Sequence, residues 1–136
     1  VRFTERLSIE IDVAKNTEQA LVPSLILQPL VENAIKYAVA TQTAGGTISI
    51  KSRKFGHDLL IEVADNGPGM PEHVKQRIFE PFFTTKAVGK GTGLGLSIVY
   101  TIIENHKGTL EVRTAQGKGS NFIITLPIYQ NIQQHD

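Results

Sequence analysis

Residues Leu27–Ala38, with the sequence LQPLVENAIKYA, form the stretch that says most about the fold. Apolar residues recur in it at spacings of three and four, which is the pattern of a helix that buries one face. We therefore predict a helix over about residues 23–40. Pro29 lacks a backbone N–H and should kink this helix or make it start late. The predicted buried stripe consists of Leu27, Leu30, Val31, Ala34, Ile35 and Ala38.

The opposite face of this helix is polar and carries Glu32, Asn33, Lys36 and Tyr37. Asn33, Lys36 and Tyr37 are spaced so that their side chains converge. An amide oxygen suits a metal ion, an ammonium suits a phosphate, and an aromatic ring suits a flat base. A solvated helix face would show the same pattern. For Glu32, which could be a general base, we expect a solvated or helix-end role.

The sequence on either side of this helix predicts one sheet. Residues 66–91 are expected to be irregular, as in a lid over a site. The order of elements predicts an α/β fold, in which one mixed sheet has helices packed on one face. Strands are predicted over about 7–13, 47–53, 59–65, 109–113 and 121–127, and a second helix begins near Thr92. This helix should bury Gly95, Ile98, Val99, Ile102, Ile103 and His106.

Asp65 ends a strand in which Leu59, Ile61 and Val63 share its side. A carboxylate at the end of a buried row needs a hydrogen-bond donor. The exocyclic amine of adenine is such a donor, and the bond would be charge-assisted. Guanine would present an acceptor there and be repelled. An ordinary turn would also explain the sequence Asp-Asn-Gly-Pro-Gly.

Two groups of glycines follow this aspartate. Gly67 and Gly69 allow a close approach of the backbone to a ligand and a positive φ. A second group, Gly89, Gly91, Gly93 and Gly95, precedes a predicted helix at every second position. Such a loop presents N–H groups to an anion, and Lys86 and Lys90 add positive charge. The spacing matches neither G-x-G-x-x-G nor G-x-x-x-x-G-K-[ST], and a flexible linker remains an alternative.

The totals fit one globular domain. The 136 residues include 14 basic and 13 acidic side chains and no cysteine. This balance argues against nucleic-acid binding through bulk charge, and the lack of cysteine excludes disulfides and thiol catalysis. No apolar run is long enough to span a bilayer. Because the chain begins at Val1 and Met70 is its only methionine, we expect it to start inside a longer protein.

The stretches LQPLVENAIKYA, DNGPGM, FEPFFTTK and GTGLGLSIV occur in this order. They resemble the asparagine box, first glycine box, phenylalanine box and second glycine box of the catalytic and ATP-binding domain of bacterial sensor histidine kinases, in the GHKL superfamily. ENHKGTLEV and GKGSNFIITLP resemble the closing helix–strand unit and the final strand. VPSLILQPLVENA is most similar to kinases paired with LytTR-type regulators, whereas the lid resembles nitrogen-regulation and PAS-linked kinases.

The resemblance implies a two-layer α/β sandwich, the Bergerat or GHKL fold, that binds ATP or ADP with Mg²⁺. Asn33 would ligate Mg²⁺, and Lys36 and Lys86 would contact phosphates, which makes these three the catalytic candidates. The phosphates would be flanked by Gly91, Thr92, Gly93, Leu94, Gly95 and Leu96. Pro29 departs from the family, since many members have an asparagine there. The metal shell must then use Asn33, phosphate oxygens and water.

At the base end, the resemblance implies that Asp65 accepts from the adenine amine in a pocket shaped by Gly67 and Gly69. Tyr37 would pack against the nucleotide. Phe79 and Phe82 would anchor the lid, although the sequence alone allows both to be simple core residues.

The implied reaction is transfer of the γ-phosphoryl of ATP to a histidine on a separate dimerisation and phosphoacceptor domain, then to a response-regulator receiver domain. None of His57, His73, His106 and His135 has the phosphoacceptor setting, and His106 is expected to be structural. The catalytic domain would span residues 1–129, with a lid over about 66–91 and a polar tail at 130–136. We expect a cytoplasmic, monomeric domain without nucleic-acid partners; whether the parent is anchored in the inner membrane stays open.

Two other readings remain. Gyrase-, chaperone- and mismatch-repair-type GHKL ATPases usually carry a base four residues before the metal asparagine, and Pro29 cannot act as one. A degenerate domain could bind nucleotide without transferring phosphate. Asn33, Asp65 and the glycines argue against such a degenerate domain.

Overall fold

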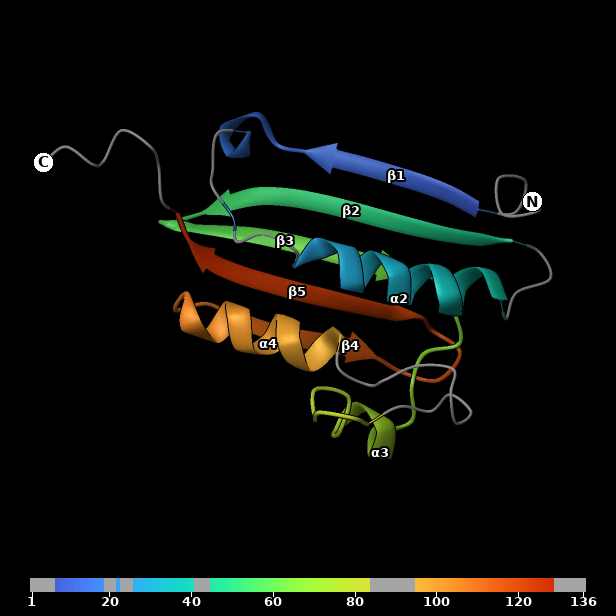
Figure 1. Cartoon of the computed structure of the whole chain (residues 1–136). Helices are drawn as coiled ribbons and strands as arrows, with labels where there is room; N and C mark the ends of the chain where they lie inside the picture. The colour runs from blue at the N-terminus through green and yellow to red at the C-terminus, as the bar shows by residue number, and fades with distance from the viewer. Residues whose placement is uncertain (1–6, 19–21, 23–25, 41–44, 84–94, 129–136) are drawn as a thin grey trace, which may run out of the picture.

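The computed structural model describes residues 7–18, 22, 26–40, 45–83 and 95–128, with the backbone alone described at 37–40. The strands are β1 (Leu7–Val13), β2 (Gly46–Phe55), β3 (Asp58–Asp65), β4 (Thr109–Thr114) and β5 (Ser120–Pro127). The helices are α2 (Leu27–Ala40), α3 (Glu72–Lys75) and α4 (Gly95–Asn105), and a 3-10 turn, η1, covers Lys15–Thr17. Figure 1 shows their arrangement.

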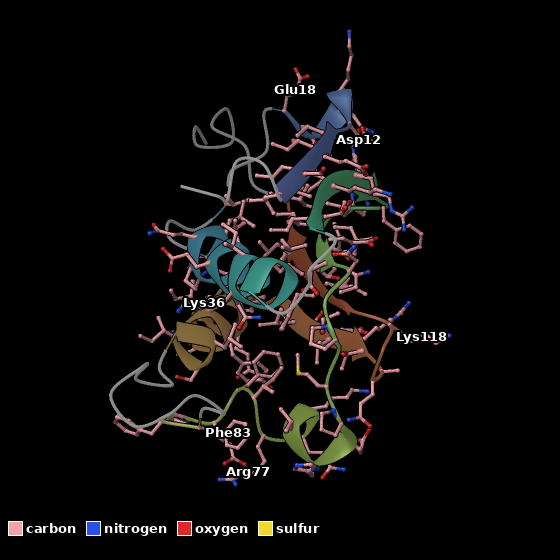
Figure 2. The ribbon with its side chains drawn as sticks, turned by 90° about the vertical axis from the view of Figure 1, so that its right-hand side faces the viewer. Asp12, Glu18, Lys36, Arg77, Phe83 and Lys118 are labelled. Carbon is pink, nitrogen blue, oxygen red and sulfur yellow. The ribbon has the colours of Figure 1, made fainter. Side chains whose placement is uncertain are left out.

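The described strands form one five-stranded sheet in the order β1-β2-β3-β5-β4. β1 pairs with β2 in parallel, and the other three pairings are antiparallel. Helices α2 and α4 lie on the same face of the sheet (Figures 1 and 2). The prediction of one mixed sheet with helices on one face is therefore confirmed.

The core lies between this helix pair and the three central strands. Leu30 and Ala34 of α2 are at most 3% exposed, as predicted from the helical spacing. Val99 and Ile103 of α4 are fully buried, one turn apart. The sheet contributes alternate residues of β2, β3 and β5: Ile48, Leu59, Ile61, Val63, Phe122, Ile124 and Leu126. This packing places the end of β3 and the start of β5 beside the start of the lid segment.

Helix α2 is described from Leu27, so Pro29 lies in its first turn. The N–H groups of the first turn have no partner within a helix, so a proline there removes no intrahelical hydrogen bond. Of the two outcomes predicted for Pro29, a late start is the one observed.

The predicted inner face of α4 is wrong at three positions, the first of which is Gly95, an exposed residue at the start of the helix. Ile98 is 52% exposed, because the buried stripe runs through Val99 and Ile103. His106 is exposed and follows the helix, where its Nδ1 lies 2.8 Å from the carbonyl oxygen of Ile102. Lys107 then takes a positive φ of 65°, which turns the chain out of the helix. The predicted start near Thr92 lies outside the described residues.

The lid segment contains more structure than predicted. The short helix α3 interrupts it, and the ring of Phe79 stacks on Tyr100 of α4 with centroids 5.2 Å apart. Phe79 therefore anchors this segment, as expected. Phe82 does not, since it is 72% exposed. Phe83 instead packs against the core, and the Arg77 guanidinium lies 4.6 Å from the centre of its ring (Figure 2).

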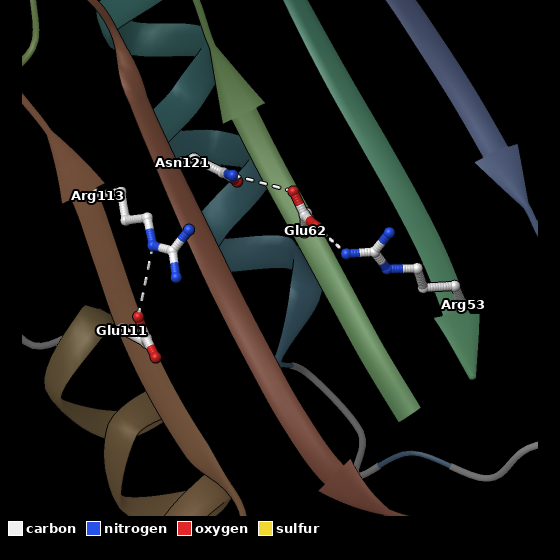
Figure 3. Close-up of polar contacts among 5 residues, drawn as sticks. All are labelled: Arg53, Glu62, Glu111, Arg113 and Asn121. Carbon is white, nitrogen blue, oxygen red and sulfur yellow. Dashed lines mark hydrogen bonds and ion pairs between the residues drawn. The ribbon is translucent and has the colours of Figure 1, made fainter. Parts of the chain in front are cut away.

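The other face of the sheet carries a group of polar side chains (Figure 3). Glu62 of β3 accepts a hydrogen bond from Asn121 at 3.0 Å and lies 3.7 Å from Arg53. Arg113 and Glu111 of β4 form a further pair at 3.7 Å. Exposed pairs of this kind contribute little to stability, so they mark the solvated face. Within the described part of the chain, no helix is long and apolar enough to cross a membrane.

Candidate nucleotide-binding site

Asp65 is the last residue of β3, and the alternation of side chains along the strand sets the direction of its side chain. Val63, two residues earlier, is 1% exposed, so Asp65 follows a buried row as predicted. Its Oδ1 accepts a hydrogen bond from the N–H of Gly67 at 2.8 Å, and the carboxyl also accepts from the N–H of Ser120. Burial raises the pKa of the Asp65 carboxyl, and these two bonds partly oppose the shift. The result is a fixed, partly desolvated acceptor.

The base loop, residues Asp65–Met70, is packed closely against the turn of the β4–β5 hairpin (Figure 1). Gly69 has a φ of 74°, as predicted, and a Cβ placed on it would lie 1.9 Å from the carbonyl oxygen of Ala115. The N–H of Gly117 donates to the carbonyl oxygen of Pro68 at 2.6 Å. Gly67 does not take the predicted positive φ. It is buried instead, and its N–H holds Asp65.

Sequence reasoning missed Thr114 and Ser120, which complete this end of the site. Ser120 is 8% exposed and pairs with Asp65 in the sheet register. The hydroxyl of Thr114 lies 2.9 Å from that of Ser120 and accepts from the N–H of Met70 at 3.0 Å. The glycine turn before Ser120 predicts a hairpin. Only the register of β3 with β5 shows that the hairpin reaches the base loop.

The face of α2 carries the candidates for the phosphate end. Asn33 is half-buried and Lys36 is exposed, and neither makes a hydrogen bond or ion pair with another described residue. Figure 2 shows Lys36 on the side of α2 that faces α4. Glu32 is exposed and accepts a hydrogen bond from Gln28 at 2.9 Å, which agrees with a solvated role. The side chain of Tyr37 lies outside the described part of the chain.

The start of α4 lies beside the first turn of α2. A Cβ on Gly95 would lie 3.7 Å from the Cβ of Pro29, one turn from Asn33. Leu96 packs against the core. The remaining candidates of the glycine-rich loop and the lid, Lys86, Gly91, Thr92, Gly93 and Leu94, lie outside the described residues. Among the residues that are described, no group of three or more acidic or histidine side chains could hold a metal ion.

A hollow of about 400 Å³ also opens beside Asp65. Its lining includes Arg113, Lys118 and Asn121. Arg113 and Asn121 belong to the polar face of the sheet (Figure 3), and Lys118 lies across the sheet from Lys36 (Figure 2). The hollow is also bordered by Asp65, Thr114 and Ser120, so residues from both faces of the sheet meet at its edge there.

Three of the four histidines lie in the described residues. His57 occupies the β2–β3 turn, as predicted. His73 lies on the short helix α3, and His106 is exposed after α4. His106 does not belong to the core, which corrects the prediction that it lies on an inner face, but its contact with the Ile102 carbonyl oxygen at the helix end agrees with a structural role. His135 lies outside the described residues.

The described part of the chain thus has a sheet with helices on one face, an acidic residue at the end of β3 and a loop after it that is shaped by Gly69. Residues 18–130 match the family described as histidine kinase-, DNA gyrase B- and HSP90-like ATPases, and the chain belongs to this family.

The relatives are sensor kinases of greater length. The chain is 43% identical to sporulation kinase E of Bacillus subtilis (strain 168) over 103 residues, which are 75% of this chain and 14% of that protein. The nucleotide-free catalytic domain of histidine kinase ThkA superposes with a TM-score of 0.76 at 31% identity, covering 93% of this chain and 83% of that one. Full-length ShkA in complex with AMPPNP gives 0.73 at 26% identity, covering 95% and 27%.

The chain thus corresponds to one domain of such proteins and is homologous to histidine kinase catalytic domains. The predicted sensor-kinase family is confirmed.

Proposed function

We propose that this chain binds ATP with Mg²⁺ and transfers the γ-phosphoryl group to a histidine on a dimerisation and phosphoacceptor domain of its parent protein. A receiver domain would then take the phosphoryl group. The observation that carries the proposal is the Asp65 carboxylate, held by two backbone N–H groups at the end of a buried strand. The complex of the relative ShkA with AMPPNP supports an adenine nucleotide as the ligand.

The base end would select adenine. Gly67 and Ser120 hold the Asp65 carboxyl by their N–H groups, so its remaining lone pairs are available to the exocyclic amine of adenine. Guanine carries a carbonyl at that position, which would repel the carboxylate. Because Gly69 has no side chain, the base loop can pack against the hairpin. The Asp65 side chain then stays on the side of the sheet that faces the helices.

The phosphate end would use α2, the start of α4 and the lid. Lys36 and Lys86 would contact phosphates, and Gly91, Thr92, Gly93, Leu94, Gly95 and Leu96 would line them. Asn33 would ligate Mg²⁺. The donor set fits this ion, because Mg²⁺ accepts few protein ligands and keeps phosphate oxygens and water. When bound, Mg²⁺ would neutralise charge on the phosphates.

The transfer itself needs little covalent chemistry from the chain. The bond from the γ-phosphorus to the bridging oxygen breaks, a bond from the histidine nitrogen to that phosphorus forms, and ADP leaves. The residues of this chain would hold the nucleotide in line and balance charge, which is how phosphoryl transfer is generally catalysed. The acceptor histidine would come from the partner domain.

Nucleotide choice tests the binding half of the proposal. Calorimetry with Mg²⁺ should show ADP binding at least about tenfold more tightly than GDP, a difference of about 1.4 kcal/mol. Asp65→Asn should weaken ADP and reduce this preference, because the amide can place a donor against the adenine amine. Equal affinities of the unaltered chain for ADP and GDP would overturn the assignment of Asp65.

Transfer is tested with γ-labelled ATP. The chain alone should bind ATP without labelling itself, and a supplied phosphoacceptor domain of its parent should gain acid-labile label. Release of phosphate without label on that domain would favour an ATPase of another type. Nucleotide binding with neither activity would favour a degenerate binding module. Label on the isolated chain that is lost on mutating one of His57, His73, His106 or His135 would show that the acceptor is internal.

A further inference from the structure

We propose that Thr114, at the end of β4, is a positioning residue that fixes the base loop and thereby the selectivity for adenine. This inference rests on the proposed function, since it assumes that Asp65 reads the base. Thr114 would not touch the nucleotide. It would act through Met70, at the far end of the base loop, and through Ser120, which pairs with Asp65 in the sheet register.

The hydroxyl of Thr114 connects three segments of backbone. Its Oγ1 accepts from the N–H of Met70 at 3.0 Å and donates to the carbonyl oxygen of Gly119 at 3.0 Å. The hydroxyl of Ser120 lies 2.9 Å away. A hydroxyl has one hydrogen and two lone pairs, so Ser120 donates to Thr114 and all three positions are used. A valine of the same shape would break every one of these bonds.

The surrounding backbone leaves the loop no alternative place while the hairpin stays fixed. A Cβ on Gly69 would meet the Ala115 carbonyl oxygen at 1.9 Å, and one on Gly119 would meet the Asp65 carbonyl oxygen at 2.2 Å. The Gly117 N–H also donates to the Pro68 carbonyl oxygen. Backbone therefore packs on backbone along the whole contact, and the shape of the hairpin turn sets the shape of the base loop.

The hairpin reaches the selecting carboxyl through Ser120. Its N–H is one of the two donors to Asp65, and its buried side chain is bonded to Thr114. If the Thr114 hydroxyl is lost, the Ser120 side chain loses a partner and the Met70 N–H is left unpaired. Both changes loosen the frame in which Asp65 is held, while Asn33 and Lys36 on α2 are not involved.

The experiment compares Thr114→Val with Thr114→Ser, which keeps the hydroxyl, and with Thr109→Val, an exposed threonine of the same strand. The probes are ADP, GDP and pyrophosphate, with affinities from calorimetry. Thr114→Val should weaken ADP about tenfold, or about 1.4 kcal/mol. The affinities for GDP and pyrophosphate should change by less than about twofold. Thr114→Ser and Thr109→Val should bind as the unaltered chain does.

If Thr114 has only a structural role, Thr114→Val should lower stability or weaken the binding of all three probes equally. Either result, with an unchanged ratio of ADP affinity to GDP affinity, overturns the proposal. If Thr114→Val does not fold, Ser120→Ala carries the test, since it removes only the hydroxyl partner and keeps the N–H to Asp65. Its ADP-to-GDP ratio should fall about threefold, roughly 0.65 kcal/mol, and no change would be decisive against the proposal. If the unaltered chain shows no preference for ADP, the proposed function fails instead. Faster amide exchange at Met70 in Thr114→Val would then still show whether Thr114 positions the loop.

Discussion

At the base end of the proposed site, the loop after β3 is packed against a hairpin, whereas at the phosphate end Asn33 and Lys36 project from the surface of α2. The base end is held by hydrogen bonds of 2.6–3.0 Å between described groups. The two α2 side chains make no such bond with another described residue. One end is therefore built by the fold, and the other by side chains without a hydrogen-bond or ion-pair partner among the described residues.

Because of this difference, substitutions at the two ends should affect stability and nucleotide binding in different ways. A change at the base end should alter the folded chain and the nucleotide affinity together, because the same contacts carry both. A change at the phosphate end should alter affinity alone, since surface side chains without partners contribute little to folding.

Gly69→Ala should have the largest effect. The added Cβ would collide with the Ala115 carbonyl oxygen, and the φ of 74° already disfavours a side chain. We expect a loss of about 3 kcal/mol or more in the free energy of unfolding, at the upper end for single substitutions. ADP should bind roughly 100-fold more weakly, or about 2.7 kcal/mol. Urea unfolding and calorimetry measure the two effects.

Gly117→Ala is the matched control for that substitution. Gly117 lies in the same hairpin turn with a φ of 80°, but a Cβ there meets nothing within 4 Å. It should cost only the strain of a left-handed residue, about 1–2 kcal/mol, and leave ADP affinity nearly unchanged. Equal losses in both variants would show that backbone strain, and not the packing of the loop on the hairpin, explains the effect.

Asn33→Ala should have an intermediate effect, confined to binding. Loss of the amide oxygen should weaken the Mg²⁺-dependent part of ADP affinity about tenfold, as when a metal loses support from its protein ligands. Binding without Mg²⁺ should change little. The free energy of unfolding should stay within about 0.5 kcal/mol, because alanine is a good helix former. Titrations with and without Mg²⁺ separate the two parts.

Glu32→Gln is the neighbouring control on α2. Glu32 is exposed and bonded to Gln28, so its charge should not affect the dependence on Mg²⁺. If this variant abolishes the Mg²⁺ dependence while Asn33→Ala retains it, Glu32 is the ligand. If Asn33→Ala destabilises the fold by several kcal/mol, the contrast between the two ends is wrong.

The sequence predicted the elements of this fold because their patterns are local. The helical spacing in Leu27–Ala38 and the alternation before Asp65 each depend on one segment and its solvent exposure. The faces of α4 were less predictable. Ile98 and Val99 are both apolar, and only the direction in which the helix packs decides that Val99 is buried and Ile98 is 52% exposed.

The site was predictable where a residue type is itself unusual in its place. Asp65, an acidic residue after a row of apolar residues, and Gly69, a glycine in a turn, can each be recognised from the local sequence. Thr114 and Ser120 do not, because hydroxyl residues near a hairpin are common and their roles arise from strand register. Phe82 and Phe83 show the same limit, since one positive φ, 67° at Phe82, decides which of two adjacent rings meets the core.

The smallest expected effect is a pH dependence that follows Asp65. Burial raises the pKa of this carboxyl above its ordinary value of 3.8. Between the unfolded and folded pKa values, the folded chain binds more protons than the unfolded chain. The stability that this group contributes is therefore fully present below the unfolded pKa and falls as the pH rises through the folded pKa.

Adenine binding should follow the opposite trend, because the amine prefers the ionised carboxylate. As the pH rises from 3.8, the ordinary pKa of this group, to neutrality, the unaltered chain should lose stability relative to Asp65→Asn, while its ADP affinity increases and that of the variant stays flat. Urea unfolding and calorimetry at both limits measure this. If the unaltered chain instead gained stability over the variant with rising pH, the two N–H donors would outweigh burial. The base end would then favour the charged carboxylate before any nucleotide arrives, and Asp65 would stabilise the fold as well as select the base.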